Sequence, residues 1–312
     1  MNISYLVQKR KSHSKFFLSL LLVIFFTHSC SSPAKHTFFE KAEKDRYEEF
    51  FKRFLFLDSG VYTLYGSKPM TEIILCPESP EEKLALQEEA LKKLSPEELE
   101  QFKASSFEYE ENYWFEETWA MWEKQLATLP IKRYLFVERK IGIPPESQKN
   151  RYIYFINIEE TAKVLQSHYH LFKEYVGFDF DPLSVVFEVK KADSPFWNAI
   201  WDRPITDKNV CLIGILFGFG FENSYPFSWY FTENPSVEKT AFIQTVLNGA
   251  SSTTTPKELK QFHPPNCFFL PGYASFSQFD PHKEKYQKEY ERIRQIYRHS
   301  DLIDCTMQQL LR

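Results

Sequence analysis

The sequence lacks the short motifs by which most catalytic and metal centres are recognised. It has no G-x-S-x-G nucleophile elbow, no H-E-x-x-H pair and no phosphate-binding loop with its lysine. Its five cysteines include no C-x-x-C spacing, which argues against a cysteine-based zinc cluster. No apolar run reaches the roughly 20 residues that a membrane-spanning helix needs. We therefore predict no cofactor, no metal site and no motif-based catalytic residue.

The amino-terminal segment has the pattern of an export signal. The first fifteen residues carry four cations and no acid, and an uncharged, largely apolar run over residues 16–26 follows them. Such a run spans roughly 16 Å as a helix, about half of the ~30 Å hydrocarbon core of a bilayer. This length suits the apolar region of a secretory signal peptide, which takes about 7–15 residues. The pattern predicts export from the cytoplasm.

The apolar run is followed by Cys30, and residues 1–33 resemble the bacterial lipoprotein precursors, whose processing site places a small residue before an invariant cysteine. Ser29 fits that pattern, whereas Thr27 stands where leucine is usual. The resemblance implies cleavage before Cys30, diacylglycerol on its sulfur and acylation of the new amino terminus. Several acyl chains make a lasting anchor, because one chain binds only marginally. By the same analogy, Ser31 favours the outer membrane.

On this interpretation residues 1–29 are a signal peptide, residues 30–40 a flexible tether, and residues 41–312 a single compact domain with soft internal boundaries near 130 and 250. The expected location is the cell envelope, facing the periplasm, with the lipid (a palmitate-type chain) on Cys30 as the link to the membrane. Two alternatives stay open. The segment could remain as an uncleaved anchor with an ordinary thiol at Cys30, or the chain could be secreted in soluble form.

The composition of the mature part indicates a folded, acidic protein. Cleavage would leave 34 basic against 42 acidic residues, a formal net charge of −8. A domain this acidic lacks the positive surface that binds phosphate backbones, which argues against nucleic acid as a partner. With 17% aromatic and 43% hydrophobic residues, the chain can bury a sizeable core.

Four cysteines follow Cys30, and their spacing leaves their pairing open. Export would permit disulfides, and an even number is compatible with two bridges in any of three pairings. Buried free thiols explain the same residues equally well, because unpaired cysteine is among the most buried residue types. The four are Cys76, Cys211, Cys267 and Cys305.

Capping patterns and periodicity predict a helix-rich α+β fold with a small mixed sheet packed against helices. Helix starts, each a capping residue followed by proline, are expected at Ser79, Ser95, Thr255 and Asp280. Amphipathic stripes predict helices over 106–129, whose tryptophans we assign to the core, and over 159–176. Strands are expected over 134–138, 152–158 and 184–189. Residues 210–221 are uncharged and predict a buried helix or a central strand.

Two clusters of polar residues suggest chemistry but have simpler explanations. His168 and His170 would point about 200° apart on a helix, so they cannot share one metal ion, and a buried His168 is the better interpretation. Asp179 and Asp181 could serve acid–base chemistry or hold a hard cation. Their alternation with phenylalanine is instead typical of a chain leaving a helix, and an aspartate before proline suits a turn.

The segment from Gly214 to Ser224 combines three glycines with a run of polar residues. The third glycine of a dinucleotide-binding fingerprint is missing, because position 223 is Asn. The spacing of Gly214 and Gly218 would let a helix approach another backbone closely, and Gly220 would end that helix. The alternative is a polar cluster at the mouth of an aromatic-lined pocket, formed by Glu222, Asn223, Trp229 and Tyr230.

The leading hypothesis is a membrane-anchored envelope lipoprotein that acts by binding or scaffolding, with an envelope protein as a possible partner. Its lipidation site is Cys30, and its candidate ligand-binding residues are Glu222, Asn223 and Trp229. One rival is an envelope hydrolase whose site is assembled from dispersed residues, namely Asp179, Asp181, Glu222 and His168. A third possibility is a carrier of an apolar ligand, which requires a closed cavity of some hundreds of Å³ lined by Phe and Trp.

Overall fold

The computed structural model describes residues 39, 41–75, 114–139, 151–201, 206–231, 236–239, 241, 264–266, 268–273, 275–276, 280–298 and 300–312. Contacts along the chain separate Met1–Glu40 from Lys41–Arg312, and the second unit is described here by itself. The predicted signal peptide, the tether apart from residue 39, and the helix starts near 79, 95 and 255 lie outside the described residues. So do Cys30, Cys76 and Cys267.

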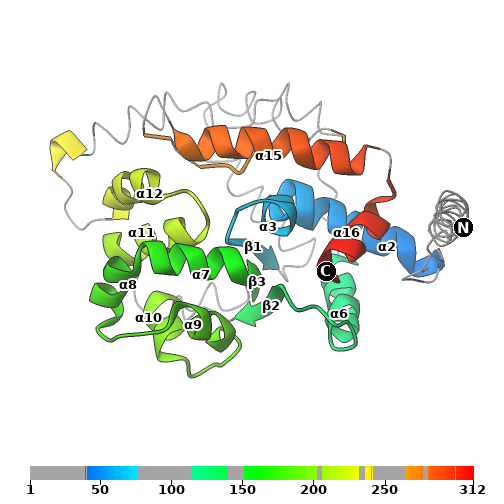
Figure 1. The fold of residues 1–312 in the computed structure, drawn as a ribbon, viewed down its shortest axis with the longest axis horizontal. Coiled ribbons are helices and arrows are strands. Elements are labelled where there is room, and N and C mark those ends of the chain that lie inside the picture. The colour runs from blue at the N-terminus through cyan, green and yellow to red at the C-terminus, as the bar shows by residue number, and fades with distance from the viewer. Residues whose placement is uncertain are drawn as a thin grey trace, which may run out of the picture. The chain divides into compact units, whose positions relative to one another are not determined.

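The described part of Lys41–Arg312 consists of helices around one small sheet (Figure 1). In chain order the elements are α2 (Lys41–Phe51), the π-helical turn η1 (Lys52–Leu57), α3 (Gly60–Tyr65), β1 (Met70–Leu75), α6 (Trp114–Leu126), β2 (Tyr134–Arg139), β3 (Arg151–Asn157), α7 (Ile158–Ser167), α8 (Tyr169–Val176), α9 (Pro182–Glu188), α10 (Pro195–Trp201), α11 (Asp207–Leu216), α12 (Phe221–Ser228), the 3₁₀ turn η3 (Trp229–Phe231), α15 (Pro281–Tyr297) and α16 (Leu302–Leu310). The predicted helix-rich α+β class is confirmed. Among the described helices, none combines the length and the apolarity that crossing a bilayer requires.

The sheet has three strands in the order β1-β3-β2, with β3 in the centre. Both pairings are antiparallel, so the described sheet is not mixed as predicted. The strands expected near 134 and 152 are confirmed as β2 and β3. The third expected strand, 184–189, is wrong, because this segment forms helix α9. Asp181 accepts a hydrogen bond from the Ser184 amide and Pro182 begins the helix, a start signal that outweighs the β-branched residues.

Helices cover both faces of β3, whose central residues Ile153–Ile156 are fully buried. On one face Phe155 packs against Phe54 of η1 and Phe136 of β2, with ring centroids 4.9 and 4.7 Å apart. On the other face Tyr154 stacks on Trp201 of α10 at 4.4 Å. Aromatic pairs at these spacings add to the free energy gained from burial. The sheet therefore joins two aromatic layers into one core.

The tryptophans of α6 belong to this core, as predicted. Trp119 and Trp122 are both buried, and Trp122 meets the rings of Phe51 and Phe136 edge to face. The described helix begins at Trp114; the start predicted at 106 lies outside the described residues. Aromatic burial explains this stripe without a bound ligand.

The single helix predicted over 159–176 is two helices. α7 ends at Ser167, and α8 begins at Tyr169, after His168 has left helical geometry. α8 ends at Gly177, whose φ of 88° is the left-handed conformation that glycine adopts at helix ends. The break gives two short helices, and each of them lines a different hollow of the described structure.

The uncharged run near 210–221 includes most of helix α11, whose buried residues confirm the helical alternative, and the turn that leads into α12. Gly214 allows the two helices to approach closely, because a methyl group there would lie 2.5 Å from the Ser224 Oγ. The connection uses Gly218 and Gly220, with φ values of 82° and 76°. The predicted packing role is confirmed for Gly214, whereas Gly218 lies beyond the end of the helix.

Helix α15 begins at the predicted aspartate–proline start and packs against α3 (Figure 1). Asp280 accepts hydrogen bonds from the amides of His282 and Lys283, which caps the helix. The buried Tyr286 of α15 meets Tyr62 of α3 edge to face at 5.4 Å and donates a hydrogen bond to the Gly218 carbonyl. α15 thereby fixes the turn between α11 and α12.

Candidate functional site

The three predicted ligand-binding residues lie near one another in sequence, but their side chains make contacts in different parts of the structure. Asn223 is only 3% exposed, and its side-chain amide donates to the Phe219 carbonyl and to the Asp280 carboxylate, at 2.9 and 3.1 Å. Its oxygen accepts from the Phe276 amide. Every polar atom of this side chain is thus used to join α12 to the start of α15, and the residue is structural.

Glu222 is exposed, and its carboxylate lies 3.8 Å from Nε2 of His282. His168 lies close enough to influence both groups, and its ring stacks on Phe221. Burial lowers the pKa of both histidines below its ordinary value, and Glu222 only partly counteracts this. The structure therefore brings Glu222 and His168 together, with His282, which the sequence analysis did not identify.

Trp229 packs edge to face against Tyr225, with ring centroids 5.5 Å apart. The Lys239 ammonium lies 4.9 Å above the Trp229 ring, a cation–π contact. Trp229, Glu222 and Asn223 line neither of the two hollows that the described residues form. Tyr225, their neighbour on α12, does line one.

That pocket lies between α8, α11 and α12 and has a volume of about 400 Å³. Its walls are mainly apolar and aromatic, and its charged residues are Glu174, Asp207 and Lys208. The full set of described lining residues is Leu171, Glu174, Tyr175, Asp207, Lys208, Cys211, Leu212, Phe221, Tyr225 and Ser228. Volume and lining both fall within the usual range for small-molecule sites.

One wall of the pocket contains the buried thiol of Cys211. Burial, together with the nearby Asp207 carboxylate, raises the pKa of this thiol to about 12. A thiol with this pKa stays protonated near neutral pH and is a poor nucleophile. Cys211 and Cys305 are both free, so neither forms a disulfide. The pocket is suited to non-covalent binding.

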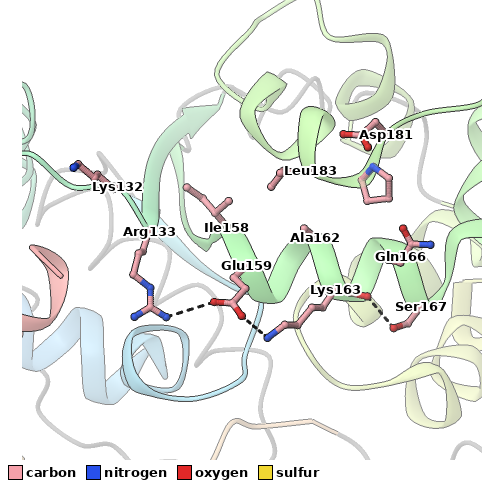
Figure 2. Close-up of a pocket in the computed structure, with 11 residues that line it drawn as sticks. Lys132, Arg133, Ile158, Glu159, Ala162, Lys163, Gln166, Ser167, Asp181 and Leu183 are labelled. Atoms are coloured by element: carbon pink, nitrogen blue, oxygen red, sulfur yellow. Dashed lines mark hydrogen bonds and ion pairs between the residues drawn. The ribbon is translucent and has the colours of Figure 1, made fainter.

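A second hollow, of about 590 Å³, lies between α7, the start of α9 and the segment before β2. Figure 2 shows Glu159 between Arg133 and Lys163 along its lower edge. The Glu159 carboxylate lies 3.6 Å from Arg133 and 2.7 Å from Lys163, and hydrogen bonding to Lys163 lowers its pKa. Lys163 also pairs with Glu160 at 2.8 Å. Most charges of this hollow are therefore already neutralised.

The two aspartates of the predicted hydrolase site have separate structural partners. Asp179 accepts a hydrogen bond from the Tyr169 hydroxyl and pairs with Lys173, each at 2.6 Å. Asp181 caps α9 and lines the second hollow. Neither lines the α8–α11–α12 pocket, and Glu222 and His168 line neither hollow. Among the described residues, no group of three or more His, Cys, Asp or Glu side chains is placed to hold a metal ion.

A buried lysine just before β1 is a feature that was not predicted from the sequence. Lys68 is 5% exposed, and its ammonium donates to the Met70 carbonyl at 2.6 Å and to the Thr71 hydroxyl at 3.0 Å. It also lies 5.6 Å from the centre of the Phe217 ring. Burial lowers the pKa of Lys68 to about 7, because the charged form loses its hydration.

Two carboxyl groups accompany this lysine. Burial raises the pKa of Asp58 to about 7, with Lys68 and Arg53 acting in the opposite direction. Glu72 accepts a hydrogen bond from the Tyr154 hydroxyl at 2.8 Å, and burial raises its pKa as well. Neither described hollow reaches the cluster, so we assign it to the core and not to a binding site.

Comparison with known proteins gives no relative from which a function could be inferred. No protein-family model matches the chain, and no curated protein or solved structure is significantly similar to it.

Proposed function

We propose that the protein is a lipid-anchored component of a bacterial envelope that binds a small ligand with an apolar body. The pocket between α8, α11 and α12 is the observation that carries the binding role. The export pattern and Cys30 support the location, with the outer membrane favoured and nucleic acid not expected as a partner. An envelope protein remains a possible further partner in a scaffolding role.

The geometry favours binding over catalysis. Leu171, Leu212 and Phe221 give the pocket apolar surface, whose removal from water contributes about 25 cal/mol per Å². Its one thiol is protonated near neutral pH, as its raised pKa requires. Two of the three carboxylates of the hydrolase hypothesis are engaged elsewhere, Asp179 by Lys173 and Asp181 by the start of α9, and the third, Glu222, lines neither hollow.

The carrier hypothesis is the alternative that the pocket favours most. It requires a closed cavity of some hundreds of Å³ lined by Phe and Trp, and the pocket meets the volume with about 400 Å³ and has Tyr175, Phe221 and Tyr225 in its lining. It has no tryptophan among its described lining residues and is not fully closed. A ligand held there would keep one end in contact with solvent, which suits a binding protein that exchanges its ligand.

Titration calorimetry of the full-length chain with the neutral probe 3-phenylpropanol tests this role. Tyr225→Ala removes a 47% exposed part of the pocket wall and should weaken probe binding about tenfold. Phe187→Ala is the matched control, because Phe187 is 52% exposed on α9 and lies outside the pocket. Equal affinities for the wild type and Tyr225→Ala, or no binding at millimolar probe, would contradict the proposal.

A further inference from the structure

Two carboxylates at the edge of the α8–α11–α12 pocket form no ion pair with any described residue. Glu174 is exposed in the last turn of α8, and within the described part of the chain it forms no ion pair. Asp207 opens α11 and forms none either; its carboxylate accepts only the Lys208 amide, at 2.9 Å. With Lys208 as the single cation of the lining, the described pocket carries a net negative charge.

The aromatic walls offer a second feature that attracts a cation. Phe221 and Tyr225 stack with ring centroids 5.3 Å apart and planes 16° from parallel. The electron-rich face of an aromatic ring attracts an ammonium group, an effect that strengthens where water is excluded. The adjacent Trp229, edge-on to Tyr225, already holds the Lys239 ammonium over its ring in this way.

We propose that this pocket selects an organic cation, a ligand with an apolar body and one ammonium group. The inference rests on the proposed binding function and specifies its ligand class. The apolar body would lie against Leu171, Leu212 and the aromatic rings, and the ammonium group would face the carboxylates of Glu174 and Asp207. The positive charge of Lys208 would repel the ammonium group of the ligand. Removing that charge should therefore strengthen binding, whereas removing the charge of Glu174 should weaken it.

The test compares three probes of similar size on the full-length chain: 3-phenylpropylammonium, the neutral 3-phenylpropanol and the anionic 3-phenylpropionate. In low salt the ammonium should bind roughly 3- to 10-fold more tightly than the alcohol, and the carboxylate more weakly than either. This preference should shrink in 0.5 M salt, because the charges are near the surface.

Two variants at exposed positions connect the preference to the pocket. Glu174→Gln should lower the ratio of ammonium to alcohol affinity about threefold, whereas Lys208→Met should raise this ratio by a similar factor. Thermal unfolding of both variants verifies that they fold. Equal affinities for ammonium and alcohol in all three proteins would overturn the cation selectivity and leave the binding function standing. Failure of every probe to bind would overturn both.

Discussion

The buried ammonium of Lys68 makes the stability of the protein depend on pH in a specific direction. The ordinary pKa of a lysine is 10.5, and burial lowers that of Lys68 to about 7. Between these values the unfolded chain binds the proton more strongly than the folded chain, so stability rises as pH increases and falls as pH decreases towards 7. From pH 7 to pH 9 this one group should raise the free energy of unfolding by about 2 kcal/mol.

Asp58 does not obscure this effect. Burial raises its pKa to about 7, so the folded state binds its proton more strongly than the unfolded state does. The stability that Asp58 contributes is therefore greatest at low pH, and most of it is lost before the pH has risen to 7. The interval from pH 7 to pH 9 consequently reports chiefly on Lys68.

Urea unfolding of the full-length chain at pH 7, 8 and 9, followed by tryptophan fluorescence, measures this dependence. The variant Lys68→Met removes the titrating group with a side chain of similar length and should remove most of the rise. Lys190→Met, at an exposed position, is the control and should retain the wild-type profile. A wild-type stability that stays flat over this interval, or a Lys68→Met profile with the same rise, would refute the reasoning.

Three further substitutions or reactions test the packing around α11 and α12. Gly214→Ala should destabilise the protein by about 1–3 kcal/mol, because its methyl group would lie 2.5 Å from the Ser224 hydroxyl; thermal unfolding would show a smaller effect in a Ser224→Gly background. Asn223→Ala should cost about 2–4 kcal/mol in urea unfolding, because it removes three hydrogen bonds, to the Phe219 carbonyl, to the Asp280 carboxylate and from the Phe276 amide; a loss below 0.5 kcal/mol would contradict this. Cys211 should resist iodoacetamide at pH 8 in the folded chain and react after unfolding, as peptide mass mapping can determine; rapid labelling of the folded chain would contradict its burial.

The sequence allowed the elements with strong local signals to be predicted. Asp280 followed by proline marks the start of α15, and Gly177 marks the end of α8, because capping and left-handed backbone depend on nearby residues. Strand β1 was missed, because Glu72 interrupts its apolar pattern and the charged Lys68 lies two residues before its start. Contacts distant in sequence accommodate both residues: Tyr154 donates a hydrogen bond to Glu72, and the Lys68 ammonium lies over the Phe217 ring.

The α8–α11–α12 pocket could not be predicted in the same way. Its lining residues extend from Leu171 to Ser228, and only tertiary packing brings the three helices together. The predicted ligand-binding residues Glu222, Asn223 and Trp229 lie on or directly after α12, which forms one wall of the pocket. Helical periodicity assigns neighbouring residues to different faces, and the side that faces the pocket carries Phe221 and Tyr225 instead.

The lipid anchor on Cys30 is the claim on which the proposed place of action depends, and metabolic palmitate labelling tests it most directly. The wild type and Cys30→Ala would be labelled and then fractionated into membrane and soluble pools. The proposal predicts a labelled wild type in the membrane fraction and an unlabelled variant that is no longer retained there. An unlabelled wild type that still sediments with membranes, or one that is soluble, would contradict it.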